Sequence, residues 1–119
     1  MTDSEPSTRS PEDDVPLRDM LTFTRRAVAA AADRNRSELD SDVVLAAALE
    51  RFTEVVGEAA SKVSESTKEG TPSIPWSKII GVRDRLIHGY SADDHDIVWD
   101  VVAVDLRQMI DVLEELLAD

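Results

Sequence analysis

Residues 75–90, PWSKIIGVRDRLIHGY, decide the fold because they combine a helical pattern with an unusually placed cation. A proline opens this run and Gly89 closes it, as is common at helix ends. On a helical wheel the large apolar side chains fall on one arc, with Arg83 in its middle. The arc contains Trp76, Ile79, Ile80, Leu86, Ile87 and Tyr90. Burying a guanidinium is costly unless a partner neutralises it, so Arg83 predicts a functional site.

His88 lies outside this arc, on the polar side of the helix with Asp84 and Arg85. Because Arg83 and His88 are five residues apart, they point about 140° away from each other on a straight helix. They can share a site if the helix bends near Gly89 or if two chains meet across a symmetric dimer. An arginine that holds a phosphate and a histidine that exchanges protons suit metal-independent RNA cleavage. The alternative is a buried salt bridge beside an exposed histidine at a helix end.

The composition indicates one helical domain. The chain has 119 residues, no cysteine and only 4% aromatic residues. The lack of cysteine excludes disulfides, thiolate metal sites and a cysteine nucleophile. No stretch approaches the roughly 20 apolar residues of a membrane span, so we expect a cytoplasmic protein with no membrane partner.

The net charge of −12, from 25 acidic and 13 basic residues, limits nucleic-acid binding. A surface this acidic repels RNA as a whole, so a local basic patch is required. Residues 76–90 form such a patch, with Lys78, Arg83 and Arg85 against Asp84 alone. We therefore consider Lys78 and Arg85 as contacts for RNA phosphates, although they can equally be solvated charges.

The order of segments predicts a short tail followed by four helices. Residues 1–14 are polar and acidic and should form a disordered tail, leaving residues 15–119 as the helical domain. Helices are expected over about 16–33, with Asp14 as cap, over about 41–67 and over 75–88. The last helix should begin at the acidic residues 93–96. Short connections favour an all-α, up-and-down bundle of four or five helices.

Apolar stripes predict how these helices pack. The stripe of the second helix is Val44, Ala48, Phe52, Val55, Ala59 and Val63, and that of the last helix is Val98, Val102, Leu106, Met109, Leu113 and Leu116. Gly57 interrupts the second helix at a cost of about 1 kcal/mol, which predicts close packing against another element. Glu54 and Glu58 flank it; either can reach Arg83, but two solvated glutamates are the favoured interpretation. The apolar faces are wide for so small a domain, so we expect a homodimer.

Four segments resemble the HepT-like toxins of the HEPN superfamily. They are residues 55–60 (VVGEAA), 74–76 (IPW), 80–90 (IGVRDRLIHGY) and 96–99 (DIVW). The resemblance extends over residues 17–117, and the motif Arg-x4-His-x-Tyr is present as Arg83, His88 and Tyr90.

The resemblance implies an all-helical ribonuclease that acts without a metal or other cofactor. It implies that Arg83 and His88 are catalytic and that two subunits bring their motifs into one cleft. The protein would then be the toxin of a type II toxin–antitoxin system, cleaving tRNA or mRNA. Its partner would be a minimal nucleotidyltransferase antitoxin, which in some systems adds AMP to the tyrosine that corresponds to Tyr90.

Asp84 departs from the family pattern, in which asparagine often follows the motif arginine. A carboxylate here repels RNA unless it orients His88, four residues away. The alternative function is therefore a non-catalytic helical module that binds a nucleotidyltransferase and acts as a nucleotide or RNA adaptor. A metal site is not expected, because the spacing of ligand-type residues between His88 and Asp96 matches no common site.

Overall fold

The computed structural model describes residues 9–88 and 94–118, and every regular element in these two ranges is helical. The all-α prediction is therefore confirmed. The helices are α1 (Asp14–Ala31), α2 (Glu38–Ser41), α3 (Val43–Ser61), α4 (Glu65–Glu69), α5 (Trp76–Ile87), α6 (His95–Asp100) and α7 (Arg107–Leu117). A 3₁₀ turn, η1 (Pro11–Asp13), precedes α1, and a π-helical segment, η3 (Val101–Leu106), joins α6 to α7.

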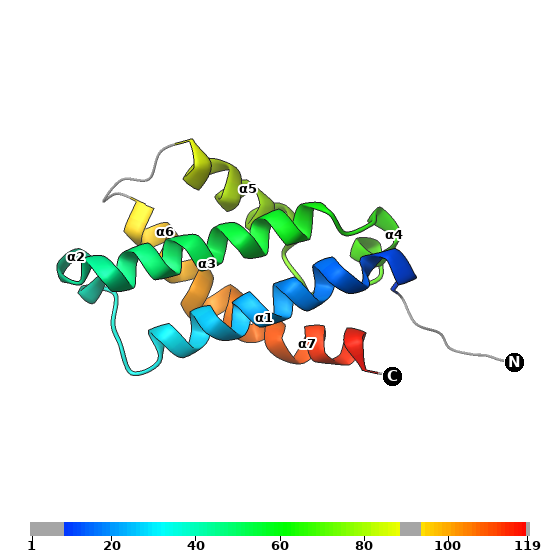
Figure 1. The fold of residues 1–119 in the computed structure, drawn as a ribbon, viewed down its shortest axis with the longest axis horizontal. Helices are drawn as coiled ribbons and strands as arrows, with labels where there is room; N and C mark the ends of the chain where they lie inside the picture. The colour runs from blue at the N-terminus through cyan, green and yellow to red at the C-terminus, as the bar shows by residue number, and fades with distance from the viewer. Residues whose placement is uncertain (1–8, 89–93, 119) are drawn as a thin grey trace, which may run out of the picture.

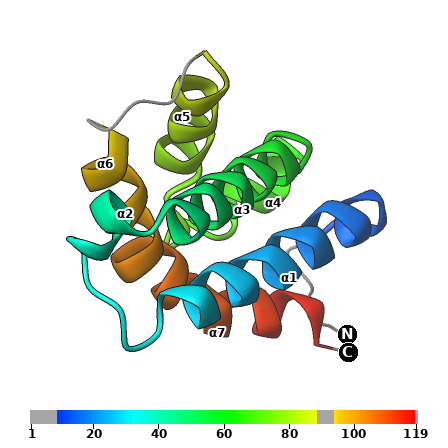
Figure 2. The same cartoon turned by 60° about the vertical axis from the view of Figure 1, so that its left-hand side comes forward.

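The four main helical segments are α1, α3, α5 and the continuous rod formed by α6, η3 and α7. Helix α3 lies in the centre, with α1 on one side and α5 on the other (Figures 1 and 2). The rod crosses behind α3, which α6 contacts, and packs along α1 through η3 and α7 (Figure 1). Helix α5 packs chiefly on α3 and projects from the body of the bundle (Figure 2). Packing of about four main helices is therefore confirmed, while the up-and-down order and the homodimer stay predictions.

The fold begins earlier than the expected boundary at residue 15. Helix α1 starts at Asp14 and the 3₁₀ turn precedes it, so Asp14 is not the cap. Its carboxylate instead binds Arg18 at 2.8 Å, one turn along the helix. Residues 1–8 of the predicted tail lie outside the described residues.

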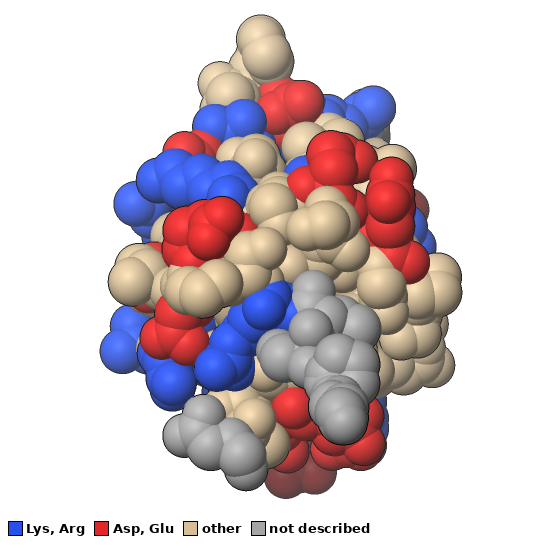
Figure 3. Space-filling model, turned by 90° about the vertical axis from the view of Figure 1, so that its right-hand side faces the viewer, with Lys and Arg blue, Asp and Glu red and all other residues tan. Residues whose placement is uncertain are grey.

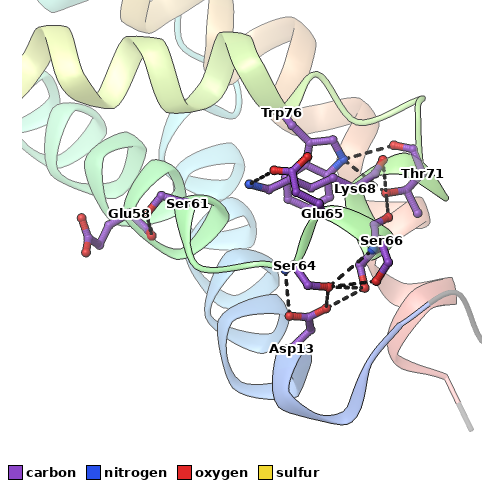
Figure 4. A network of polar contacts seen from close by, with 10 residues as sticks. Asp13, Glu58, Ser61, Ser64, Glu65, Ser66, Lys68, Thr71 and Trp76 are labelled. Carbon is purple, nitrogen blue, oxygen red and sulfur yellow. Dashed lines mark hydrogen bonds and ion pairs between the residues drawn. The ribbon is translucent and has the colours of Figure 1, made fainter.

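Asp13 explains why this segment is ordered. Its side chain is buried and accepts hydrogen bonds from the Ser64 amide at 3.0 Å, the Ser64 hydroxyl at 2.6 Å and the Thr67 hydroxyl at 2.6 Å (Figure 4). Burial opposes ionisation, but these hydrogen bonds outweigh it and hold the pKa of Asp13 below its usual value. A carboxylate 51 residues before Ser64 thus fastens the start of α1 to the corner between α3 and α4.

The prediction of a single helix over residues 41–67 is wrong, because this part of the chain forms two helices, α3 and α4. Asp42 caps α3 by accepting from the Leu45 amide at 3.0 Å, where Ser41 or Asp40 was expected. Helix α3 ends at Ser61, and Ser64 caps α4. The helix is interrupted here because Ser64 both caps α4 and binds Asp13.

The buried stripe of α3 is also shifted from the predicted one. Val44, predicted inside, is 76% exposed, whereas Leu45, Leu49 and Val56 are buried. Ala59 and Val63 are buried as predicted. The stripe of the last helix is confirmed at its first five positions; at the sixth, Leu116 is half-buried and Leu117 is buried instead. Among the described residues, no helix is long and apolar enough to cross a membrane.

Candidate active site

Helix α5 positions the candidate residues against α3. Trp76, Ile79 and Leu86 are buried on this helix as predicted, and Val82 joins them. Ile87, placed in the apolar arc by the sequence, is 54% exposed, so that part of the prediction is wrong. The buried arc is rotated toward Val82, and Arg83 lies at its edge with a side chain that is 25% exposed.

Gly57 of α3 is the point where α5 approaches most closely. A Cβ atom at residue 57 would lie 3.0 Å from Arg83 Cγ and from the carbonyl oxygen of Ile79, and closer still to Arg83 Cβ. Ordinary side-chain contacts are longer than this, so only glycine leaves room for the stem of Arg83. The predicted close packing at Gly57 is confirmed, and its partner is the candidate arginine itself.

Two carboxylates neutralise the guanidinium of Arg83. Glu58 on α3 forms an ion pair with Nη2, and Asp84 binds Nη1 at 2.9 Å. The favoured interpretation, two solvated glutamates, is therefore wrong for Glu58, whereas Glu54 pairs with Arg51 at 3.3 Å. The sequence offered both Glu54 and Glu58 as possible partners of Arg83 and favoured neither. The place of Glu58 directly after Gly57 was the available signal, because a residue next to a close helix contact lies near the other helix.

His88 caps the C-terminal end of α5 and is exposed. Its Nδ1 lies 2.5 Å from the backbone oxygen of Asp84. A carbonyl oxygen can only accept, so Nδ1 carries the hydrogen and Nε2 of a neutral ring is left as a proton acceptor. The anticipated contact between the Asp84 carboxylate and His88 is not formed, because that carboxylate binds Arg83. The backbone of Asp84 orients His88 instead.

Arg83 and His88 do not converge within the helix. Helix α5 is regular through Ile87, so the five-residue offset separates the two side chains around its axis. Both residues therefore lie near the C-terminal end of α5, but their side chains are not brought together. Tyr90 lies outside the described residues, so its predicted role stays a prediction.

Both candidate RNA contacts are ion-paired within the chain. Lys78 lies 2.6 Å from Asp105 and 3.0 Å from Asp100, and hydrogen bonds to these two carboxylates raise its pKa. Arg85 binds the buried Asp94 at 2.6 Å. The Arg85–Asp94 pair links α5 to the residue that directly precedes α6. Contact of Lys78 and Arg85 with RNA remains a prediction.

Among the described residues, both basic and acidic side chains lie on the face of the molecule shown in Figure 3. Within residues 9–88 and 94–118, no group of three or more His, Asp or Glu side chains is placed to hold a metal ion. Asp93, part of the metal alternative, lies outside these ranges.

Comparison with known proteins gives one family. Residues 17–116 match the family described as "Ribonuclease HepT-like". A Methanocaldococcus jannaschii protein named "Putative RNase MJ0125" is 28% identical over 103 residues, covering 87% of this chain and 89% of the relative. A Thermococcus cleftensis protein named "Probable ribonuclease HepT" is 33% identical over 66 residues, covering 56% and 60%. No solved structure matches the chain significantly.

Proposed function

Since the chain belongs to the HepT-like ribonuclease family, we propose that it is a metal-independent endoribonuclease whose active site is shared by two subunits. The observation that carries this proposal is the placement of Arg83. The stem of Arg83 is held by the close contact at Gly57 and its guanidinium by Glu58, yet a quarter of the side chain remains exposed. A partly exposed, pre-oriented arginine can bind a phosphate with little loss of side-chain entropy.

The chemistry follows from the two side chains. Nε2 of His88 takes the proton from a ribose 2′-hydroxyl, and the 2′-oxygen attacks the adjacent phosphorus. Arg83 neutralises the charge that develops on the phosphoryl oxygens. The bond from phosphorus to the 5′-oxygen breaks, and the same His88, now protonated, gives this proton to that oxygen. The products are a 2′,3′-cyclic phosphate and a 5′-hydroxyl, so no metal or redox partner is needed.

A second subunit supplies what one chain lacks. Arg83 and His88 diverge around α5, and two copies related by a two-fold axis would place one arginine opposite the partner's histidine. The protruding position of α5 and its exposed Ile87 favour such a contact.

The biological role extends the proposal. As a toxin, the protein would cleave tRNA or mRNA and would be neutralised by a minimal nucleotidyltransferase antitoxin. Transfer of AMP to Tyr90 would place bulk and negative charge two residues from His88 and block an incoming RNA phosphate. Incubation with ATP and such an antitoxin should raise the intact mass by AMP units. Persistence of the increase in Tyr90→Phe would exclude this tyrosine.

A non-catalytic adaptor is the second candidate, favoured by the pairing of Arg83 with two carboxylates. Purified protein incubated with RNA in EDTA separates the two functions. Wild type should produce fragments that end in 2′,3′-cyclic phosphate, and His88→Ala should produce none. Identical RNA patterns from both proteins would favour the adaptor.

A further inference from the structure

A second candidate site lies away from α5, between the end of α1 and the rod formed by α6, η3 and α7. A cavity of about 300 Å³ opens here. Its walls include Ala31 and Asp33 from the end of α1, and Trp99, Ala103 and Arg107 from the rod. Its volume is at the lower end of the range of about 300–1,000 Å³ that is typical of small-molecule sites.

The geometry of the rod creates this cavity. Trp99, Ala103 and Arg107 are spaced four residues apart and lie along one face. The π-helical segment η3 spans Ala103 and closes hydrogen bonds five residues apart, so side chains four apart align more closely than in an α-helix. The small Ala103 leaves a gap between the indole of Trp99, which is half-buried, and the guanidinium of Arg107.

Two charged groups at this cavity are not used by the fold. Across the described part of the chain, neither the Arg107 guanidinium nor the Asp33 carboxylate, both on exposed residues, has a hydrogen-bond or ion-pair partner. Arg34, also in the wall, binds Glu38 at 2.5 Å and Asp42 at 2.6 Å and is therefore already neutralised. Asp33 directly follows the C-cap residue of α1 and has a backbone φ of 60°, a left-handed conformation that is common where helices end.

We propose that this cavity binds a nucleotide. The base stacks on Trp99, the phosphate pairs with Arg107, and the Asp33 carboxylate accepts a hydrogen bond from a ribose hydroxyl. The base, the phosphate and the ribose hydroxyl of a nucleotide match Trp99, Arg107 and Asp33 in turn. Inorganic phosphate would contact only Arg107. The site is independent of the proposed ribonuclease chemistry, because none of its walls comes from α5. The nucleotide is either free in solution or part of an RNA chain.

Titration of the wild-type protein with AMP, adenosine and inorganic phosphate, followed by tryptophan fluorescence, tests this proposal. AMP should quench the fluorescence saturably and bind at least tenfold more tightly than adenosine or phosphate. Ala103→Leu fills the gap with a good helix former and should abolish binding. Arg107→Gln should weaken binding about tenfold, whereas Arg51→Gln, at an exposed arginine on α3, should leave it unchanged.

Binding that is equally tight for phosphate and AMP, or that survives Ala103→Leu, would overturn the proposal, as would absence of saturable binding. A short RNA that competes with AMP would identify the bound nucleotide as part of RNA, and failure to compete would identify a free nucleotide. His88→Ala should bind AMP normally. Loss of RNA cleavage and loss of nucleotide binding can therefore be told apart.

Discussion

Replacing Gly57 with alanine should loosen the contact that positions Arg83. The new Cβ atom would lie 3.0 Å from Arg83 Cγ and from Ile79 O, where ordinary contacts begin near 3.4 Å. One of these contacts is rigid backbone, so α5 must move away from α3. Overpacking of this kind costs about 1–3 kcal/mol, and the higher helix propensity of alanine returns about 1 kcal/mol. We expect a net loss of about 1 kcal/mol in the free energy of unfolding.

Urea unfolding of Gly57→Ala, with Gly81→Ala as a matched control, measures this effect. A Cβ atom at residue 81 meets nothing within 4 Å, so the same substitution on α5 should stabilise the protein by about 0.5–1 kcal/mol. With a urea m-value of about 1–3 kcal/mol/M, the midpoints of the two variants should shift in opposite directions by about 0.2–1 M. Equal stabilisation by both substitutions would refute the close contact at Gly57. RNA cleavage should fall in Gly57→Ala and persist in Gly81→Ala.

Three further predictions concern individual ion pairs and hydrogen bonds. Asp13→Asn should lower the free energy of unfolding by about 1–3 kcal/mol at pH 7. Because the pKa of Asp13 is lowered in the fold, this difference from wild type should become smaller below about pH 4. A difference that urea unfolding finds to be the same at every pH would contradict this. Arg85→Gln should lower the free energy of unfolding by about 1–3 kcal/mol because it removes a cation from the buried Asp94 carboxylate. Adding Asp94→Asn to this variant should recover part of the lost stability. If the losses from the two substitutions simply add, the two residues do not act as a pair. Glu58→Gln should tighten the binding of a short RNA because Arg83 loses a competing carboxylate. The binding is measured by filter binding in a His88→Ala background, which cannot cleave the RNA. Unchanged affinity would argue that Arg83 does not hold a phosphate.

The sequence predicted the helices well because their apolar periodicity is strong, but it did not predict every buried face. Helix α3 carries apolar residues at both Val44 and Leu45, and each begins a stripe with helical spacing. Only the positions of α1 and α5 decide between the two stripes, and they leave Val44 exposed. The break after Ser61 was missed for a similar reason, since it depends on Asp13, which is distant in the sequence.

The candidate site was predicted in its residues but not in its contacts. The offset of Arg83 and His88 follows from helix geometry alone, and the close packing at Gly57 follows from the cost of a glycine within a helix. The partners of Arg83 could not be derived, because Glu54 and Glu58 both lie within reach of a helix whose rotation the sequence leaves open. Asp84 shows the same limit: its carboxylate binds Arg83, and its backbone oxygen, which carries no sequence signal, binds His88.

The central claim, a site shared by two subunits, is tested most directly by mixing two inactive variants. Arg83→Gln and His88→Ala should each fail to cleave RNA in EDTA. When the two are unfolded and refolded together, mixed dimers retain one intact arginine and one intact histidine on different chains. We predict that cleavage returns in the mixture in proportion to the mixed dimers detected by native mass spectrometry. Mixed dimers that form but remain inactive would contradict a shared site.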